Sequence, residues 1–358
     1  MSVSRDKILI VGGYGAVGTI VSKDLAIRFP GKVLIAGRNK HKALAVIGQH
    51  NLDALPIELD LNSGSFGDID FNQVHTAISC IEYLRDDNFI HACIKGGVHY
   101  TELATSYEAY QRLINYGEEV EESKICLIPG VGLMPGLSGV FVQNAIAKLQ
   151  EIRAVESFIL LGLGENHGLD AIRWMLKFVN KTFTLQTEER EEQVKSFADP
   201  VEEQLLSENR PRKFYRFDFG DQHIIKEVTE VDSAQTRLAF DSRAITWLIA
   251  KLRKVGLLNK VSKINPQSVK RWLDMFRFGS EQFAVQTHCY GRFGDEMIFL
   301  AEGFNEANAT GKIAAYAVAL LYESNKKTGI RRFEEVVEFN DFTQYLRENQ
   351  INVKVTII

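Results

Sequence analysis

Residues 7–18 read KILIVGGYGAVG, and this stretch decides the fold. The run from Lys7 to Val11 is short and rich in β-branched residues, which is typical of a strand buried on both faces of a parallel sheet. Four glycines follow within seven residues, and an amphipathic segment, Thr19 to Arg28, comes after them. Strand, glycine turn and helix in this order predict an α/β fold that begins with a dinucleotide-binding unit.

Each glycine of this loop has a predicted role. Gly13 makes the tight turn, Gly15 lets the backbone approach a pyrophosphate, and Gly18 lets the helix pack closely on the strand. The helix N-terminus then holds the phosphate charge. The cofactor-binding residues predicted here are Gly12, Gly13, Tyr14, Gly15, Ala16, Val17 and Gly18. The alternative is a glycine-rich turn with no ligand.

The second predicted strand, Lys32 to Ala36, ends in Gly37-Arg38-Asn39. NAD-binding proteins usually place an acidic residue near this point to hold the ribose hydroxyls. A guanidinium at Arg38 can instead pair with a 2′-phosphate, and no carboxylate is present to repel it. We therefore expect Arg38 and Asn39 to bind NADP, with NAD as the other cofactor to test. The alternative is a solvated arginine at a strand end.

Two further strands bring residues to the same edge. Leu55 to Leu59 leads into Asp60 and Leu61, which we expect near the adenine, although Asp60 also suits a simple Asx turn. Thr76 to Cys80 leads into Ile81, and ligands lie at the carboxyl ends of parallel strands. Cys80 and Ile81 are therefore predicted to border the nicotinamide. The alternation of strand and helix through residue 128 fits one doubly wound parallel sheet.

The second half reads as a sheet with few helical crossovers. Strands are expected over 154–161, 213–219, 223–231, 283–290 and 296–302. A mixed or antiparallel sheet follows from this pattern. The helical pattern over 305–325 is expected to return to the first domain. The predicted domains are 1–135 for NAD(P) binding, 136–303 for substrate binding and dimerisation, and 304–358 for a C-terminal helix and tail that return to the first domain.

Several segments resemble one family. They are GGYGAVG, AGRN, SCIEYLRDDNFIHACIKGGVHYTELA and PGVGLMPGLSGVF, and they are similar to the saccharopine dehydrogenase family of the saccharopine reductase type, including carboxynorspermidine dehydrogenase-like proteins. The resemblance covers residues 7–145 well and 304–346 more loosely. It implies a Rossmann domain, a second α+β domain on a mixed sheet, a homodimer, and hydride transfer at a C–N bond of an amino-acid or polyamine-related substrate. Members commonly read GLDPG where this chain has Met134, which disfavours saccharopine itself.

Chemistry at a C–N bond needs a group that manages the proton on nitrogen and groups that hold carboxylates. The catalytic candidates are His99, Tyr100 and Glu102, whose other interpretation is helix capping and core packing. The substrate-binding candidates are Tyr83, His167 and Arg173, of which Arg173 faces either the site or the solvent. Two other functions stay open: a regulatory protein that binds NADP(H) without turnover, and a reductase of C=O or C=C bonds.

The composition bounds the partners. The formal net charge is −4, which gives no general attraction for polyanions, so a small-molecule substrate is expected and nucleic acid is not. The four cysteines lack ligand spacing, so no metal site is predicted. The apolar runs are too short for a signal-peptide core or a membrane span, and a cytoplasmic location without membrane contact is expected.

One stretch differs from the rest of the chain in its charge. Residues 251–277 carry eight basic residues against the single acid Asp274, with Trp247 beside them and Trp272 among them. The favoured interpretation is amphipathic helices with a solvated basic face and buried aromatic residues. The alternative is contact with an acidic partner or a membrane surface.

Overall fold

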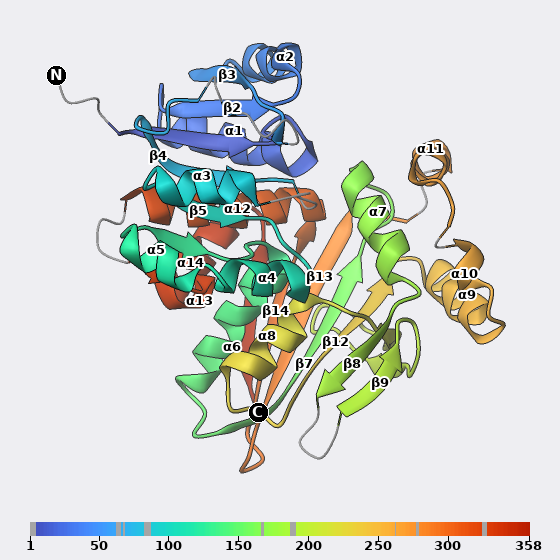
Figure 1. Ribbon diagram of the computed structural model, residues 1–358. Helices are drawn as coiled ribbons and strands as arrows, with labels where there is room; N and C mark the ends of the chain where they lie inside the picture. Colours follow the sequence, from blue (N-terminus) through green and yellow to red (C-terminus); the bar gives the residue numbers. More distant parts are fainter. Residues whose placement is uncertain are drawn as a thin grey trace. The chain divides into compact units, whose positions relative to one another are not determined.

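The computed structural model describes residues 5–358 except 62–65, 67–68, 82–86, 166–167, 187–190, 262, 277–278 and 324–327. The chain forms two compact units (Figure 1). The first consists of Met1–Gly136 and Thr310–Val337, and the second of Leu137–Ala309 and Glu338–Ile358. Each unit is therefore built from two separate stretches of chain.

The first unit contains a sheet in which every described pairing is parallel. The strand order is β15-β6-β5-β4-β1-β2-β3. The strands are β1 (Lys7–Val11), β2 (Val33–Gly37), β3 (Ala54–Glu58), β4 (Val74–Ser79), β5 (His99–Glu102), β6 (Cys126–Ile128) and β15 (Gly329–Ile330). The helices are α1 (Ala16–Arg28), α2 (Lys40–His50), α3 (Asn88–Lys95), α4 (Tyr107–Ile114), α5 (Gly117–Glu122) and α13 (Phe333–Val336). The strand order reverses between β1 and β4, which confirms the predicted doubly wound sheet and marks the crevice where such folds bind ligands.

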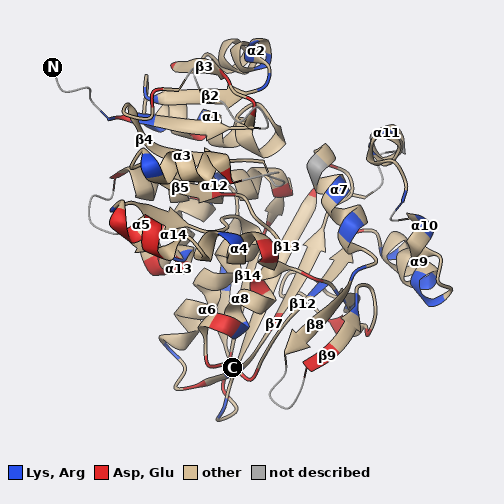
Figure 2. Ribbon diagram, in the orientation of Figure 1, with Lys and Arg blue, Asp and Glu red and all other residues tan. Residues whose placement is uncertain are grey.

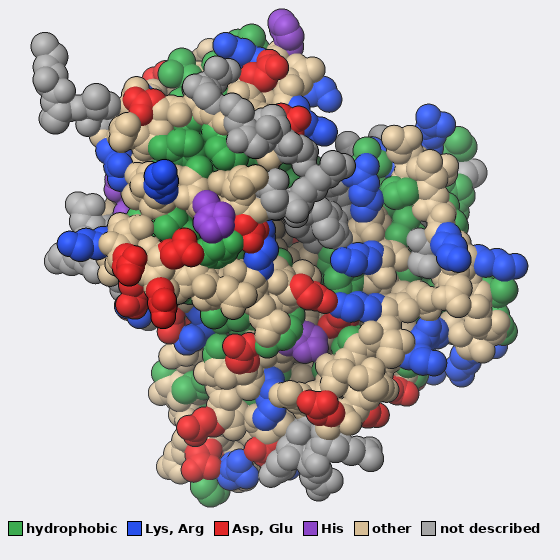
Figure 3. All heavy atoms as spheres, viewed as in Figure 1, with side chains coloured by type: hydrophobic (Ala, Val, Ile, Leu, Met, Phe, Trp, Pro, Cys, Tyr) green, Lys and Arg blue, Asp and Glu red, His purple; other side chains and the backbone are tan. Residues whose placement is uncertain are grey.

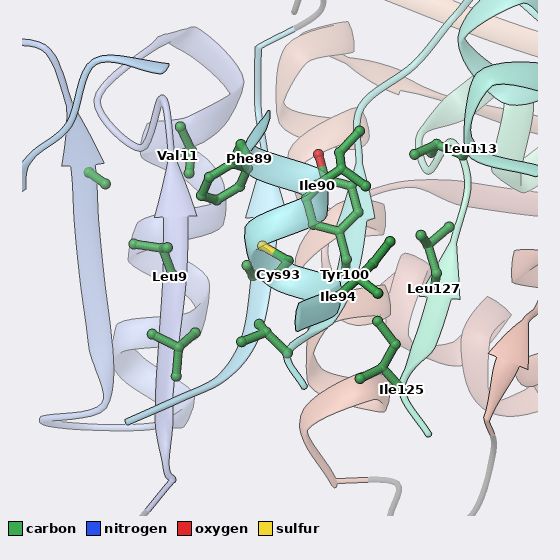
Figure 4. Packing of buried hydrophobic residues seen from close by; sticks show 14 of the residues in the cluster. Leu9, Val11, Phe89, Ile90, Cys93, Ile94, Tyr100, Leu113, Ile125 and Leu127 are labelled. Atoms are coloured by element: carbon green, nitrogen blue, oxygen red, sulfur yellow. The ribbon is translucent and has the colours of Figure 1, made fainter. Parts of the chain in front are cut away.

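The core of the first unit explains why these strands form. Leu9 and Val11 of β1 are fully buried, as a strand covered on both faces requires. Helix α3 supplies Phe89 and Cys93 to the same cluster, where they pack with Tyr100 of β5 (Figure 4). Burial of each large apolar side chain of this kind contributes about 1.5–3 kcal/mol. This core fixes the carboxyl ends of β1 and β4 relative to each other.

The second unit is built on a mixed sheet, as predicted. Its order is β10-β11-β12-β7-β13-β14-β16, with β12 and β7 parallel and the other neighbours antiparallel. The strands are β7 (Ile152–Leu161), β10 (Val201–Glu203), β11 (Arg212–Arg216), β12 (Ser233–Phe240), β13 (Gln282–Gly291), β14 (Glu296–Phe304) and β16 (Asn352–Ile357), and β8 (Thr182–Gln186) pairs separately with β9 (Glu191–Lys195). The helices are α6 (Ser138–Ile146), α7 (Leu169–Phe178), α8 (Gly220–Val228), α9 (Arg243–Lys254), α10 (Leu258–Val261), α11 (Pro266–Phe276) and α14 (Phe339–Glu348).

Two expectations for the second half need correction. Residues 223–231, expected as a strand, lie mostly in helix α8, whose buried Ile224 and Ile225 recur one turn after buried Asp221. The β-branched residues that suggest a strand here serve one face of a helix. The tail also differs from the expected boundary, because residues 338–358 belong to the second unit. There β16 pairs antiparallel with β14, and its alternating Val353 is buried.

Helix α12 (Glu306–Glu323) begins in the second unit and continues in the first from Thr310. Within the first unit it packs tightly on α1, since a Cβ at Gly311 would lie 2.7 Å from the side chain of Ile20. Lys312 Nζ lies 2.6 Å from Asp24 Oδ2 of α1. The hydroxyl of Tyr322 donates to the carbonyl of Asp6 at 3.0 Å. These contacts make α12 from Thr310 onward an integral part of the first unit.

Candidate functional site

The glycine loop after β1 folds back on β2. The N–H groups of Gly12 and Gly13 both donate to the carbonyl of Ala36, at 2.9 and 3.2 Å. Gly12 has a φ of +75°, a conformation that favours glycine, so the tight turn lies at Gly12 and not at Gly13 as expected. Gly13 is instead confined by packing, because a Cβ there would lie 2.9 Å from Ser22 Oγ.

Gly18 brings helix α1 close to this loop. A Cβ at position 18 would overlap the carbonyl oxygen of Gly12, so a side chain cannot be placed there without moving the backbone. Ser22 Oγ, one turn further along α1, donates to the carbonyl of Gly13 at 2.9 Å. Helix and loop are thus joined by both packing and a buried hydrogen bond.

The start of α1 fits a diphosphate. Gly15 is the N-cap residue of α1, is exposed, and provides no side-chain cap. The first turn of this described helix contains no acidic residue. The first N–H groups of a helix have no partner inside the helix and carry a partial positive charge. At the start of α1 these groups include those of Ala16 and Val17. The loop therefore offers hydrogen-bond donors at an open backbone surface, which is what a phosphate group needs.

Tyr14 ties the loop to the end of β2. Its hydroxyl accepts a hydrogen bond from the N–H of Asn39 at 3.0 Å, and its ring lies against the α-carbon of Gly37. Asn39 in turn caps α2 by accepting from the N–H of Lys42 at 3.2 Å. Arg38 lies between Gly37 and Asn39, which these contacts hold in place, and is itself exposed. The structure thus holds the backbone on both sides of Arg38 next to the glycine loop.

The other cofactor candidates follow neighbouring strands at the same edge. The N–H of Leu59 donates to the carbonyl of Gly37 at 3.0 Å, which places Asp60 and Leu61 just beyond the end of β2; Asp60 is exposed. On the other side, the N–H of Cys80 donates to the carbonyl of Val11 at 2.8 Å.

Cys80 and Ile81 border Gly12 directly. A Cβ at Gly12 would lie 3.1 Å from Ile81 Cγ1 and 3.5 Å from the backbone of Cys80. Burial raises the pKa of the Cys80 thiol to about 12. The thiol is therefore protonated at neutral pH and is no nucleophile.

His99 lies away from this edge. It pairs with Thr76 at the amino end of β5, and its Nδ1 accepts a hydrogen bond from the N–H of Cys126 at 2.8 Å. Burial, with a further contribution from His75 and Arg5, lowers the pKa of His99 to about 4. The structure therefore gives His99 a neutral, structural position and does not bring it to the glycine loop.

Tyr100 and Glu102 belong to a buried polar network. The Tyr100 hydroxyl donates to Glu102 Oε2 at 2.8 Å, and Arg112 Nη2 donates to Glu102 Oε1 at 2.6 Å. Arg112 also donates through Nη1 to Asp87 at 2.8 Å, and the Tyr116 hydroxyl donates to Asp87 at 2.7 Å. Burial raises the pKa of Glu102, and Arg112 opposes this shift. Glu102 lies at the carboxyl end of β5, but both of its oxygens are engaged inside the protein.

Of the substrate-binding candidates, Tyr83 and His167 lie outside the described residues. Arg173 lies on α7 and is exposed. In the part of the chain that the structure describes, no group of three or more His, Cys, Asp or Glu side chains is arranged to hold a metal ion.

Sequence reasoning missed a polar cluster at the start of α8. His223 Nε2 lies 2.7 Å from Asp218 Oδ1, and Lys181 Nζ lies 2.7 Å from Asp218 Oδ2. Burial alone would raise the pKa of Asp218, but the hydrogen bonds from His223 and Lys181 hold it below its usual range. The His223 side chain keeps 19% of its surface exposed. The signal was present as Asp218 and Gly220 just before an apolar helical pattern, which is a helix start.

Comparison with known proteins gives one family match. Residues 8–128 match the model described as the saccharopine dehydrogenase NADP binding domain. No curated protein sequence matches significantly.

Comparison with solved structures gives matches at low sequence identity, and the fold is shared with the first of those described here. Apo histidine-tagged saccharopine dehydrogenase (L-Glu forming) from Saccharomyces cerevisiae superposes with a TM-score of 0.69 at 14% identity, covering 98% of this chain and 100% of that chain. An engineered D-amino acid dehydrogenase bound to NADP+ has a TM-score of 0.47 at 12% identity, covering 93% and 95%. A mutant meso-diaminopimelate dehydrogenase from Clostridium tetani E88 has a TM-score of 0.45 at 14% identity, covering 96% and 99%.

Proposed function

Because residues 8–128 match the model of the saccharopine dehydrogenase NADP binding domain, we propose that the protein is an NADP-preferring oxidoreductase acting on a C–N bond. The substrate is an amino-acid or polyamine-related small molecule. The observation that carries the proposal is the open helix start at Gly15, together with the contacts that tie Gly37 and Asn39, on either side of Arg38, to Tyr14 of the glycine loop. Action as a cytoplasmic homodimer is part of the same proposal.

The glycine loop holds the cofactor. The N–H groups at the start of α1 bind the diphosphate, and Gly15 leaves room for its close approach. When bound, a nicotinamide cofactor supplies or accepts the hydride. Cys80 and Ile81 form an apolar border next to Gly12, which keeps water from that part of the crevice.

Arg38 selects the cofactor. Gly37, Arg38 and Asn39 include no carboxylate, so the usual partner of the ribose hydroxyls is missing at this strand end. The hydrogen bond between Asn39 and Tyr14 fixes the backbone that carries Arg38. A guanidinium held there recognises a 2′-phosphate by paired hydrogen bonds.

Glu102 is the residue we assign to the proton on the substrate nitrogen, because it lies at the carboxyl end of β5 and burial raises its pKa. His99 has no part in this step, since it lies at the amino end of β5. Hydrogen bonds from Tyr100 and Arg112 hold the Glu102 carboxyl group in place. Arg173 remains the candidate that holds a substrate carboxylate. Tyr100 is a positioning residue in this scheme, since its hydroxyl donates to Glu102.

The cofactor assignment is tested by fluorescence titration of NADPH and NADH. Arg38→Asp should weaken NADPH binding by about tenfold or more, with little effect on NADH, because it removes charged hydrogen bonds and adds a repulsive carboxylate. Arg331→Asp, at another exposed arginine of the first unit, is the matched control. Equal affinities of the wild type for both cofactors would overturn the role of Arg38.

Turnover is tested by following NADPH oxidation with pairs of an oxo acid and an amino acid, and with amino aldehydes and polyamines. Glu102→Gln should lower turnover by about 100-fold or more while NADPH affinity stays unchanged. Reduction of ketones or enoyl compounds without an amine would shift the assignment to C=O or C=C bonds. Tight NADPH binding without turnover on any pair would favour a regulatory binding protein instead.

A further inference from the structure

Helices α9, α10 and α11 of the second unit carry a concentrated positive charge. Residues 243–276 include eight basic residues and one acidic residue, a net charge of +7 in a chain whose total is −4. Figure 2 shows Lys and Arg gathered along α9 and α10. The basic stretch is thus a local feature that the average composition hides.

Large apolar side chains are exposed on the same helices. The exposed fractions are 58% for Trp247, 49% for Leu248, 64% for Val255, 44% for Ile264, 46% for Trp272 and 72% for Met275. Both tryptophans are therefore at the surface, contrary to the expectation that the aromatic residues of this stretch are buried. Figure 3 shows apolar and basic side chains interleaved over this lobe. An exposed apolar patch of this kind marks an interaction site.

The way α9 is anchored explains the exposure. Thr246 and Ala250 are buried on the inner side, and the Thr246 hydroxyl donates to the carbonyl of Phe240 at 3.2 Å. Trp247 and Lys251 then project outward one turn apart, with Lys251 Nζ 5.4 Å from the centre of the Trp247 ring. The outward face of α9 is therefore both apolar and basic. We call the exposed residues Trp247, Leu248, Lys251 and Lys254 of α9, with Trp272 and Met275 of α11, the α9–α11 surface.

Charge decides between the candidates that could cover this surface. In a twofold dimer the same patch meets itself, so the lysines of the two copies would repel each other. An acidic surface is favoured instead. The apolar side chains are spread over separate helices with lysines between them, which suits a lipid headgroup layer better than a single protein groove. Tryptophan prefers that layer, and lysine can extend its ammonium group to lipid phosphates.

We propose that the α9–α11 surface docks the protein on an anionic lipid bilayer. Trp247, Leu248 and Met275 enter the headgroup region, and Lys251 and Lys254 contact the lipid phosphates. Over the described parts of the chain, no helix is long and apolar enough to cross a membrane. Each basic residue near the surface contributes about fivefold to the affinity, which falls as salt is added.

The test is cosedimentation of the full chain with phosphatidylcholine vesicles that contain or lack about one-third phosphatidylserine. Binding to the phosphatidylserine vesicles alone, weakened by salt, is expected. Tryptophan fluorescence should shift to shorter wavelength on binding, because the only other tryptophan, Trp174, is already buried. The double variant Trp247→Ser/Trp272→Ser should lose this shift and bind about tenfold more weakly.

Charge-reversal variants test whether the α9–α11 surface, and not another part of the chain, binds the vesicles. Lys251→Glu/Lys254→Glu/Lys260→Glu should abolish vesicle binding, whereas Lys148→Glu/Lys195→Glu/Lys213→Glu, at exposed lysines elsewhere in the second unit, should not. Far-UV circular dichroism and urea unfolding check that each variant is folded. No vesicle binding at low salt, equal binding to phosphatidylcholine alone, or equal loss in both triple variants would each overturn the proposal. Binding to polyglutamate but not to vesicles would assign the surface to an acidic protein, and self-association lost in Trp247→Ser/Trp272→Ser would assign it to a second copy.

Discussion

The ring of Tyr14 lies so close to Gly37 that a Cβ at position 37 would be 2.5 Å from the ring carbon Cε1. The glycine loop and the end of β2 are therefore fitted to each other through a side chain as well as through backbone hydrogen bonds. Gly37 is the residue just before Arg38. Its missing side chain thus matters for the position of the guanidinium as well as for the turn.

Gly37→Ala should displace the Tyr14 ring and break its hydrogen bond with Asn39. We expect NADPH affinity to fall by about tenfold, since Arg38 loses its fixed backbone. The matched control is Gly48→Ala on α2, where an added Cβ meets no atom within 4 Å. That variant should keep NADPH affinity and gain slightly in stability, because alanine favours a helix over glycine. Equal NADPH affinity of both variants would contradict the coupling.

Arg112→Met should destabilise the first unit by about 3–5 kcal/mol, because it leaves the buried Glu102 carboxylate without its cation. Adding Glu102→Gln should restore much of this loss, since no buried charge then remains. Urea unfolding of the wild type, both single variants and the double variant measures the coupling. A Glu102→Gln variant with normal turnover would leave Glu102 with this structural role alone.

Glu165 should make the second unit less stable in alkaline solution. Burial, and secondly the nearby Glu306, raise its pKa to about 8. The folded state therefore prefers the protonated carboxyl, so the stability from this group is fully present below pH 4.5 or so and is lost as the pH rises through 8. Glu165→Gln should flatten the fall in urea midpoint between about pH 5 and pH 9.

The exposed Glu230→Gln is the control for this measurement and should leave the profile unchanged. Asp221, whose pKa burial raises to about 7, contributes to the wild-type slope in the same direction. The difference between the wild type and Glu165→Gln therefore isolates Glu165. An unchanged slope in that variant would show that Glu165 is ionised without cost.

Asp241 holds together the loops that follow β7 and precede β13. Its carboxylate accepts from the N–H groups of Leu163 at 3.2 Å, Ser242 at 2.8 Å, and Ser280. Asp241→Ala should cost about 2–4 kcal/mol, because it leaves several partly buried donors without an acceptor. Ser242→Ala, which removes only the cap of α9, should cost about 1 kcal/mol. Equal losses in urea unfolding would rule out the tethering role.

The first unit was largely predictable because its signals are local. A buried strand, a glycine turn and a helix follow one another directly, so the carboxyl ends of β1, β2 and β4 could be located from the sequence. His99 shows where this reasoning fails. It is only three residues from Glu102, but in a strand three residues span about 10 Å, so the two lie at opposite ends of β5.

The second unit was harder to predict because its order depends on pairings between distant residues. The parallel pairing of β12 with β7 joins Ser233 to Ala154, and no local pattern specifies it. The cluster of Asp218, His223 and Lys181 could likewise not be predicted, because residues 223–231 were expected as a strand and not as part of helix α8. The exposure of Trp247 depends on which face of α9 packs on β12. Apolar and basic residues alternate along α9, so its sequence does not indicate which face is buried.

The first unit cannot be completed until most of the chain has been synthesised. Strand β15 pairs with β6, and the paired residues Gly329 and Cys126 are about 200 residues apart in the sequence. Helix α12, which packs on α1, also comes from this late part of the chain. At about 5–20 residues per second, the edge of β6 waits roughly 10–40 s on the ribosome for its neighbour. During this interval the nascent cofactor domain exposes an unpaired strand, so its fate in the cell depends on the speed at which the second unit is translated.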